Sequence, residues 1–166
     1  MKLLNFIASF LIEKKAFAHC DIPCGIYDPH NAQAAAHTII RMTQLIKDLE
    51  ADINAPFEER KKIIHNVSRQ TRIKEKHADL LEEELATLRD DYFKEEHFKE
   101  HAILNELFIN TLKLIAKARQ ETNLQAAEET LENVLQIAEI FYKTKGVEPI
   151  RIKSVYPTGK EIVVYK

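Results

Sequence analysis

Apolar residues recur at three-to-four spacing through most of the chain, which is the pattern of amphipathic helices. Four such segments follow one another, over about residues 29–49, 56–92, 96–119 and 123–143. Asp28 and Pro29 suit the start of the first segment, Pro56 suits the start of the second, and Gly146 suits the end of the fourth. Short connections between four amphipathic helices favour an antiparallel four-helix bundle. The pattern therefore predicts an all-α fold.

The end of the chain departs from this pattern. Two runs, residues 150–156 and 161–165, are rich in β-branched and aromatic residues and flank Pro157-Thr158-Gly159. This predicts a short C-terminal β-hairpin within residues 147–166. Because an isolated two-stranded hairpin is marginal in water, we expect it to dock on the bundle or on a neighbouring subunit.

Composition agrees with one helical domain and argues against two classes of partner. The 166 residues are 45% apolar and 30% charged, with three glycines and no tryptophan. The formal net charge of −2 gives no electrostatic reason to expect a nucleic-acid partner. The apolar run over residues 3–12 is too short to cross a bilayer as a helix, so no membrane partner is expected either.

The first eighteen residues have the features of a removable leader. Lys2 precedes the apolar run, and Ala16-Phe17-Ala18 stands directly before His19. Three charged residues between the apolar run and these small residues are unusual for a secretory signal peptide. We therefore favour a cytoplasmic protein with a leader over an exported one. In either case a leader peptidase that cuts after Ala18 exposes His19 as a new N-terminus.

Both cysteines lie within the short stretch His19-Cys20-Asp21-Ile22-Pro23-Cys24-Gly25. If the chain begins at His19, its amine and imidazole, the Cys20 amide and two thiolates lie close together. Thiolates with a planar set of nitrogen donors suit Ni(II) or Cu(II), whereas a tetrahedral zinc site would not normally use the amide. Pro23 and Gly25 allow the chain to turn back so that Cys24 meets Cys20. The stretch predicts a metal-binding hook.

Two alternatives remain open from these residues. One is a non-catalytic nickel- or zinc-binding or storage protein that uses the same ligands. The other is a helical bundle whose two cysteines form a regulatory disulfide. His97 and His101 are spaced i, i+4, but no third ligand of clear spacing joins them, so we interpret them as surface or core-edge histidines.

The spacing His19-Cys20-x-x-Pro23-Cys24-Gly25-x-Tyr27 resembles the mature N-terminus of nickel-containing superoxide dismutases. Two later stretches, residues 91–94 and 140–145, are similar to the same family, and the resemblance covers about residues 19–146. It implies an enzyme that converts superoxide to oxygen and hydrogen peroxide by Ni(II)/Ni(III) cycling, with one nickel ion per subunit. It also implies a homohexamer of four-helix bundles.

The resemblance further implies the roles of five residues. His19, Cys20 and Cys24 bind the metal, with the His19 imidazole as the axial ligand of Ni(III). Tyr27 and Asp21 lie near the open face, where Tyr27 limits access and orders water that supplies protons. Three segments follow from this interpretation: the leader 1–18, the hook and bundle 19–146, and the hairpin 147–166.

One feature of the family pattern is missing. Family members often hold the axial imidazole through a Glu on the first helix and an Arg on the second. The corresponding positions here are Ala35 and His77. Partners of a ligand tune its basicity, so we expect His77, or His37 on the neighbouring turn, to take this part.

Overall fold

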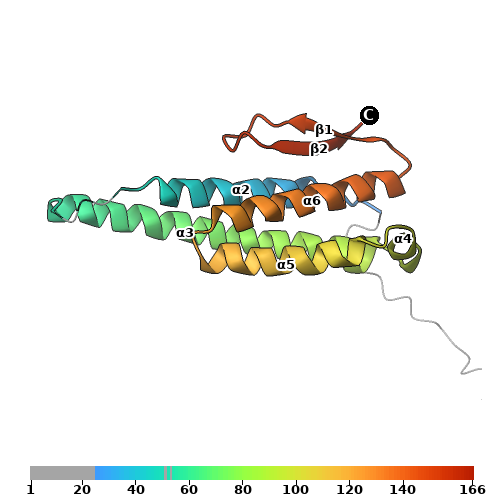
Figure 1. Cartoon of the computed structure of the whole chain (residues 1–166), viewed down its shortest axis with the longest axis horizontal. Coiled ribbons are helices and arrows are strands. Elements are labelled where there is room, and N and C mark those ends of the chain that lie inside the picture. Colours follow the sequence, from blue (N-terminus) through green and yellow to red (C-terminus); the bar gives the residue numbers. More distant parts are fainter. Residues whose placement is uncertain (1–24, 51, 53) are drawn as a thin grey trace, which may run out of the picture.

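Four long helices lie side by side in the computed structural model, which describes residues 25–50, 52 and 54–166 (Figure 1). They are α2 (His30–Lys47), α3 (Phe57–Ala86), α5 (Leu104–Gln120) and α6 (Leu124–Thr144). The chain reverses direction between successive long helices, which confirms the predicted antiparallel bundle. In the part of the chain that the structure describes, no helix is both long and apolar enough to span a bilayer.

A continuous core of small and branched side chains holds the helices together. α2 contributes mainly alanine and isoleucine, so its backbone lies close to α3 and α6. Fully buried members include Ala36, Ile39, Ile40, Leu81, Leu85, Leu104, Phe108, Ile115, Val134 and Ala138. Burying one large apolar side chain stabilises the fold by about 1.5–3 kcal/mol. The apolar faces predicted from helical spacing are therefore confirmed.

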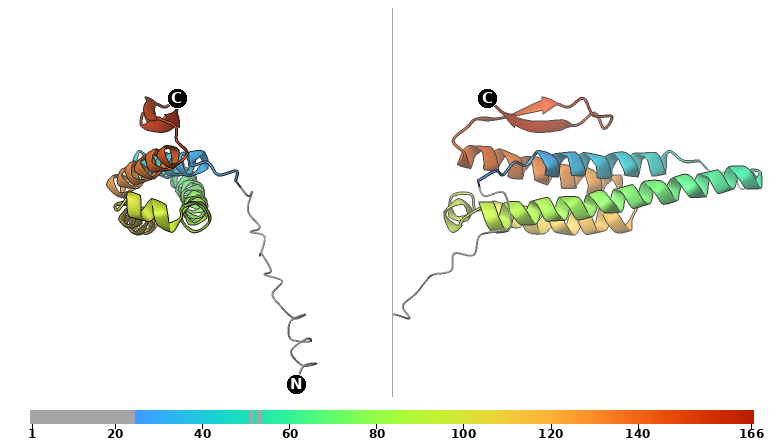
Figure 2. Two further views of the ribbon diagram at one scale, coloured as in Figure 1. Left: turned by 90° about the vertical axis from the view of Figure 1, so that its right-hand side faces the viewer. Right: turned by 180° about the vertical axis from the view of Figure 1, so that it is seen from behind.

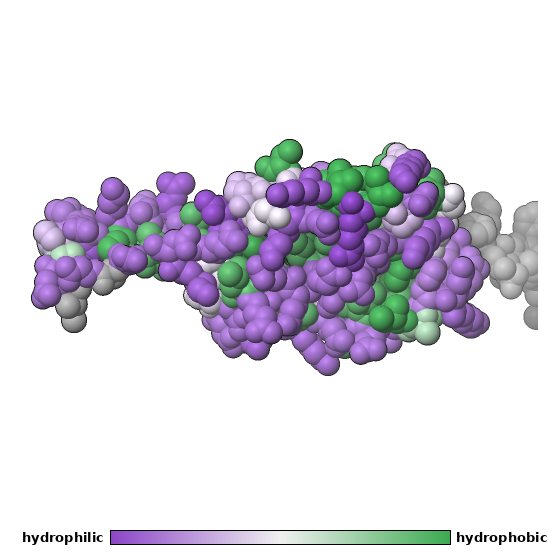
Figure 3. All heavy atoms as spheres, turned by 45° about the horizontal axis from the view of Figure 1, so that its top comes forward, coloured by the Kyte–Doolittle hydropathy of each residue, from purple (hydrophilic) through white to green (hydrophobic). Residues whose placement is uncertain are grey.

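The first half of α3 extends beyond the other helices as an arm (Figure 2). The buried residues of this helix begin only at Lys74, and Phe57 and Ile64 on the arm are exposed. Figure 3 shows largely hydrophilic side chains on the arm, and apolar ones gathered around the hairpin. Most residues between Glu58 and Arg72 are polar or charged, so this part of α3 offers no continuous apolar stripe for a neighbour to cover.

The third predicted segment is not one helix, so that expectation was wrong. It divides into a short helix α4 (Glu95–Glu100) and α5, while the second predicted segment ends in a π-helical turn η1 (Thr87–Tyr92) that continues α3. His101, with φ −115° and ψ 75°, interrupts the helical backbone. The interruption lets Phe93 and Phe98 both pack on Phe108, with ring centroids 5.9 and 6.4 Å away. Aromatic burial here outweighs local helical spacing.

The C-terminal hairpin forms as predicted and docks on the bundle. β1 (Pro149–Lys153) pairs antiparallel with β2 (Glu161–Tyr165), and the pair lies along α2 and α6 (Figure 1). The turn spans residues 154–160 and is longer than expected, since the Ser154 amide and hydroxyl both donate to the Lys160 carbonyl. Ion pairs with α6 join Arg151 to Glu132 and Glu139, and Lys160 to Glu128.

Two buried polar side chains of α2 attach the hairpin to that helix. Gln33 donates from Nε2 to the Val163 carbonyl (3.1 Å), and the Val163 amide donates to Gln33 Oε1 (2.7 Å). His37 Nε2 lies 3.0 Å from the Glu161 carbonyl, and Nδ1 lies 2.7 Å from Thr158 Oγ1. Because a carbonyl only accepts, Nε2 carries the proton and Nδ1 of the neutral ring accepts from Thr158.

The His37 contact makes stability depend on pH. Burial lowers the pKa of His37, and the hydrogen bond to the Glu161 carbonyl only partly offsets this effect. The unfolded chain, with a histidine pKa of about 6.5, therefore binds the proton more readily than the folded chain. The contribution of His37 to stability is complete above about pH 6.5 and is lost as the pH falls below that value.

We predict that the free energy of unfolding falls more steeply between about pH 7.5 and about pH 5.5 in the wild type than in His37→Gln. Urea denaturation at the two pH values measures this difference. His30→Gln, on the exposed side of the same helix, should keep the wild-type slope. A slope that does not change in His37→Gln would show that the buried ring does not couple protonation to folding.

Candidate metal centre

The structure describes the chain from Gly25 onward, directly after the predicted hook. Of the predicted site residues it describes Tyr27, whereas His19, Cys20, Asp21 and Cys24 lie outside the described residues. Pro23 and the leader lie outside them as well. We call residues 25–29 the hook root, because they join the predicted hook to α2.

The hook root has a defined path into α2. Gly25 has φ +90°, in the region that favours glycine, as expected for a chain that turns back after Cys24. The Asp28 carboxylate accepts a hydrogen bond from the His30 amide (2.7 Å). The Pro29 carbonyl accepts from the Gln33 amide (3.1 Å), so Pro29 caps the helix and α2 begins one residue later than predicted.

Tyr27 packs against the bundle through Tyr92, at the end of η1. The two ring centroids are 5.5 Å apart, and Tyr27 is half-buried against the core. The Tyr92 hydroxyl lies 2.6 Å from Thr144 Oγ1, and Thr144 donates its own proton to the Phe141 carbonyl (2.7 Å). A threonine hydroxyl has one proton, so Tyr92 is the donor to Thr144. Tyr27 therefore rests on a ring that α6 holds in place.

A cavity of about 280 Å³ lies beside Tyr27. It is lined by Tyr27, Asp28, Phe141, Tyr142, Lys145, Val147 and Tyr165. The Lys145 ammonium is 4.8 Å from the centre of the Tyr92 ring and 5.6 Å from that of Phe141. These cation–π contacts hold a positive charge next to the hook root. Residues from the hook root, the end of α6 and the end of β2 thus meet at one place.

Tyr142 joins α6 to the hairpin as a neutral ring. Its centroid lies 5.2 Å from that of Tyr165 and 5.4 Å from that of Phe141. Burial raises the pKa of Tyr142 to about 12, and the nearby Asp28 and Tyr165 act in the same direction. Its phenol therefore stays protonated at neutral pH, which excludes a role as a general base there.

Sequence reasoning did not identify Tyr92, Tyr142 or Lys145 as neighbours of the hook root. A signal was present, because all three fall in the two later stretches that resemble the family. Tyr92 is the last residue of η1, and its ring packs against that of Tyr27.

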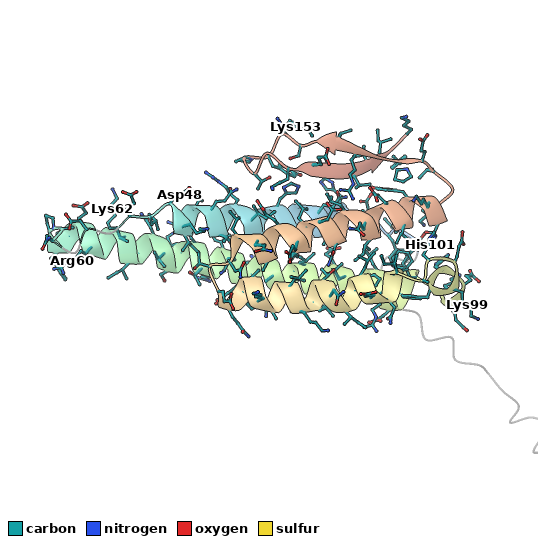
Figure 4. The ribbon with its side chains drawn as sticks, in the orientation of Figure 1. Asp48, Arg60, Lys62, Lys99, His101 and Lys153 are labelled. Carbon is teal, nitrogen blue, oxygen red and sulfur yellow. The ribbon has the colours of Figure 1, made fainter. Side chains whose placement is uncertain are left out.

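In the pair His97 and His101, His97 makes structural contacts. His97 Nδ1 accepts from the Lys94 amide (3.1 Å), which caps α4, and its ring stacks on Tyr92 at 5.9 Å. Figure 4 shows His101 and Lys99 at the end of the bundle that α4 forms. Within residues 25–50, 52 and 54–166, no three His, Cys, Asp or Glu side chains are grouped so that they could hold a metal ion.

The structure describes Ala35 and His77, the two positions that depart from the family pattern. Ala35 is buried in α2, and His77 on α3 donates from Nδ1 to the Ile73 carbonyl (2.9 Å). His37 is occupied at both ring nitrogens by the hairpin, so the expectation that it could support the axial ligand is corrected. A neutral His77 protonated at Nδ1 keeps Nε2 as an acceptor.

Comparison with known proteins identifies the family. The sequence model of nickel-containing superoxide dismutase matches residues 14–145. This chain belongs to that family. Superoxide dismutase [Ni] of Streptomyces coelicolor is 33% identical over 128 residues, 77% of this chain and 88% of the relative. The enzyme of Streptomyces seoulensis is 32% identical over 136 residues, 82% of this chain and 95% of the relative. The chain is therefore a superoxide dismutase with a nickel cofactor.

Solved nickel superoxide dismutases share the fold. The native structure matches with a TM-score of 0.64 and 31% identity, over 76% of this chain and 99% of that chain. A structure with its nickel ligation in the oxidised state gives a TM-score of 0.66 and 30% identity, over 77% and 99% of the two chains. Nearly the whole solved chain is matched, whereas the family model ends at residue 145. In this superoxide dismutase the hairpin follows the part that the family model matches.

We predict that Thr144→Val lowers the free energy of unfolding by about 1 kcal/mol more than Thr111→Val. Thr111 loses only its bond to the Leu107 carbonyl, whereas Thr144 also accepts the proton of Tyr92. Urea denaturation compares the two variants, and near-ultraviolet circular dichroism should show weaker tyrosine signals in Thr144→Val alone. Equal effects would mean that the Tyr92 hydroxyl does not depend on α6.

Proposed function

We propose that this superoxide dismutase binds nickel through His19, Cys20 and Cys24 after residues 1–18 are removed. Family membership supports this, because the family model matches from residue 14 and so includes the whole hook. The donor set of amine, imidazole, backbone amide and two thiolates suits nickel. The positive φ of Gly25 agrees with a sharp reversal of the chain directly after Cys24.

The observation that carries the proposal is the contact between Tyr27 and Tyr92. Tyr27 lies three positions after Cys24, so their Cα atoms can be at most about 11 Å apart. Tyr27 is held beside the cavity that Lys145 lines, and this short connection supports a hook at the same end of the bundle. The described residues offer no competing group of metal ligands.

Nickel held by these ligands supplies a one-electron Ni(II)/Ni(III) couple, brought within reach of superoxide by charge donated from the thiolates and the deprotonated amide. In this proposal Tyr27 limits access and orders water that delivers protons, and Asp21 lies beside it near the open face. The positive charge of Lys145, next to Tyr27, favours the approach of an anionic substrate.

We also propose that the mature enzyme is a cytoplasmic homohexamer released by a leader peptidase. The resemblance to the family supports the hexamer, and the exposed Phe57 and Ile64 on the arm of α3 offer apolar surface to a neighbouring subunit. The three charges before Ala16 support a leader that is not a secretory signal. Light scattering of the mature protein tests the hexamer.

Cleavage after Ala18 should be required for activity. While Ala18 is attached, the backbone nitrogen of His19 is part of the Ala18–His19 peptide bond. It is then an amide and not an amine, so the proposed site lacks one of its planar ligands. We expect the uncut chain, supplied with nickel, to be at least about 100-fold less active than the chain that begins at His19. Mass spectrometry establishes each N-terminus. Full activity in a chain that still begins at Met1 would contradict the proposed ligand set.

Cys24→Ser should abolish superoxide dismutation while leaving the fold intact. A serine hydroxyl does not replace a thiolate as a charge donor, so we expect at least about a 100-fold loss of activity. Helix content and oligomeric state should stay at their wild-type values. Ile26→Ser, at an exposed position two residues later, is the control and should remain active. Loss of helical structure in Cys24→Ser would instead show that the cysteine is structural.

A further inference from the structure

The hairpin extends beyond the residues that the family model matches, so the family does not explain it. β1 leaves the end of α6, and β2 returns to the end of the bundle where α2 begins, as both views show (Figures 1 and 2). The last residues of β2 therefore lie close to the hook root. The hairpin is therefore close enough to affect the position of residues 25–29.

The strongest attachment of β2 is to the first turn of α2. The amide and carbonyl of Val163 both bond the Gln33 side chain, at 2.7 and 3.1 Å, and both residues are only 1% exposed. Gln33 is also the residue whose amide bonds the Pro29 carbonyl of the hook root. These two bonds restrict motion of the start of α2. If Gln33 and Val163 separated, the two polar atoms of the Gln33 side chain and the amide and carbonyl of Val163 would lose their partners.

Tyr165 continues this contact two residues later. Its ring lies 5.2 Å from that of Tyr142, and it lines the same cavity as Tyr27 and Asp28. The Lys166 amide donates to the Glu148 carbonyl, which closes the hairpin directly after Tyr165. Tyr165 is 58% exposed, so its contact with the Tyr142 ring, and not full burial, fixes its position.

The start of the hook root is exposed. Ile26 is 79% exposed, and nothing lies within 4 Å of a Cβ placed on Gly25. Tyr27 is supported on one side by Tyr92 of η1. The hairpin contributes Tyr165 to the cavity that Tyr27 and Asp28 also line, and it holds the first turn of α2 through Gln33.

We propose that the C-terminal hairpin braces the hook root, with Tyr165 as a positioning residue that restricts motion of residues 25–33 and thereby slows the loss of nickel. This inference rests on the proposed function, since it takes the metal to be held by residues 19–24. A metal site retains its ion when its ligands are held ready by the surrounding fold. A brace on the residues that follow the hook provides that rigidity without touching the metal.

The test compares Tyr165→Ala with Tyr156→Ala in the mature chain. Both remove a tyrosine ring from the hairpin, but Tyr156 packs on His37 at the far turn (ring centroids 4.8 Å apart). Hydrogen exchange of the metal-free proteins should be about tenfold faster in Tyr165→Ala for peptides that cover residues 25–33, and unchanged there in Tyr156→Ala. Tyr165→Phe keeps the ring and should match the wild type, which separates packing from the hydroxyl.

Nickel loss gives the second readout. A chelator should remove nickel several-fold faster from Tyr165→Ala than from Tyr156→Ala or the wild type, well below the temperature at which any of them unfolds. Equal exchange over residues 25–33 in the two alanine variants would overturn the brace, whatever the metal content. A mature wild type that binds no nickel would overturn the proposed function instead, and hydrogen exchange would still decide whether Tyr165 holds the hook root.

Discussion

The contact of Tyr27 with Tyr92 links the N-terminal segment to the rest of the molecule. If the mature chain begins at His19, as proposed, no residues precede the hook, so the residues that follow it have to fix its position. Tyr27 does this by resting on a ring that donates its hydroxyl proton to Thr144 of α6. The π-helical end of α3, the end of α6 and the start of α2 are thereby joined at one point. Helix packing elsewhere can vary, but this junction must keep its geometry for a metal site to exist beside it.

The elements that followed from sequence are those whose signals are local. Apolar spacing predicted α2, α3 and α6, and Gly146 correctly predicted the end of the last helix. The break between α4 and α5 was not predicted, because its cause is the packing of Phe93 and Phe98 on Phe108 across the break, and helical spacing does not show this packing. Likewise Gln33 and His37 lie on the core-facing side of α2, and their hydrogen-bond partners are more than 120 residues away in the sequence. Local periodicity carries no information about such contacts.

The candidate site divides in the same way. Its ligand types are concentrated in a few consecutive residues, so the motif predicted the chemistry and the family before any fold was known. The cavity beside it is assembled from the hook root, the end of α6 and the end of β2, and only the fold brings Lys145 and Tyr165 to Tyr27. The replacement of a family carboxylate by Ala35 was visible in the sequence, but the occupation of His37 by the hairpin was not.

The kind of contact that holds the hairpin indicates what the hairpin contributes. Its ion pairs with α6, through Arg151 and Lys160, are partly exposed, and exposed pairs contribute about 0–1 kcal/mol each. The contacts of Gln33 and His37 are buried and directional. A shift of β2 by one residue would turn Val163 to the other face of the strand and break both bonds to Gln33. Such contacts select one register more than they add stability. Since that register places Tyr165 in the wall of the cavity beside Tyr27, positional precision at the hook root is the property that the added hairpin supplies.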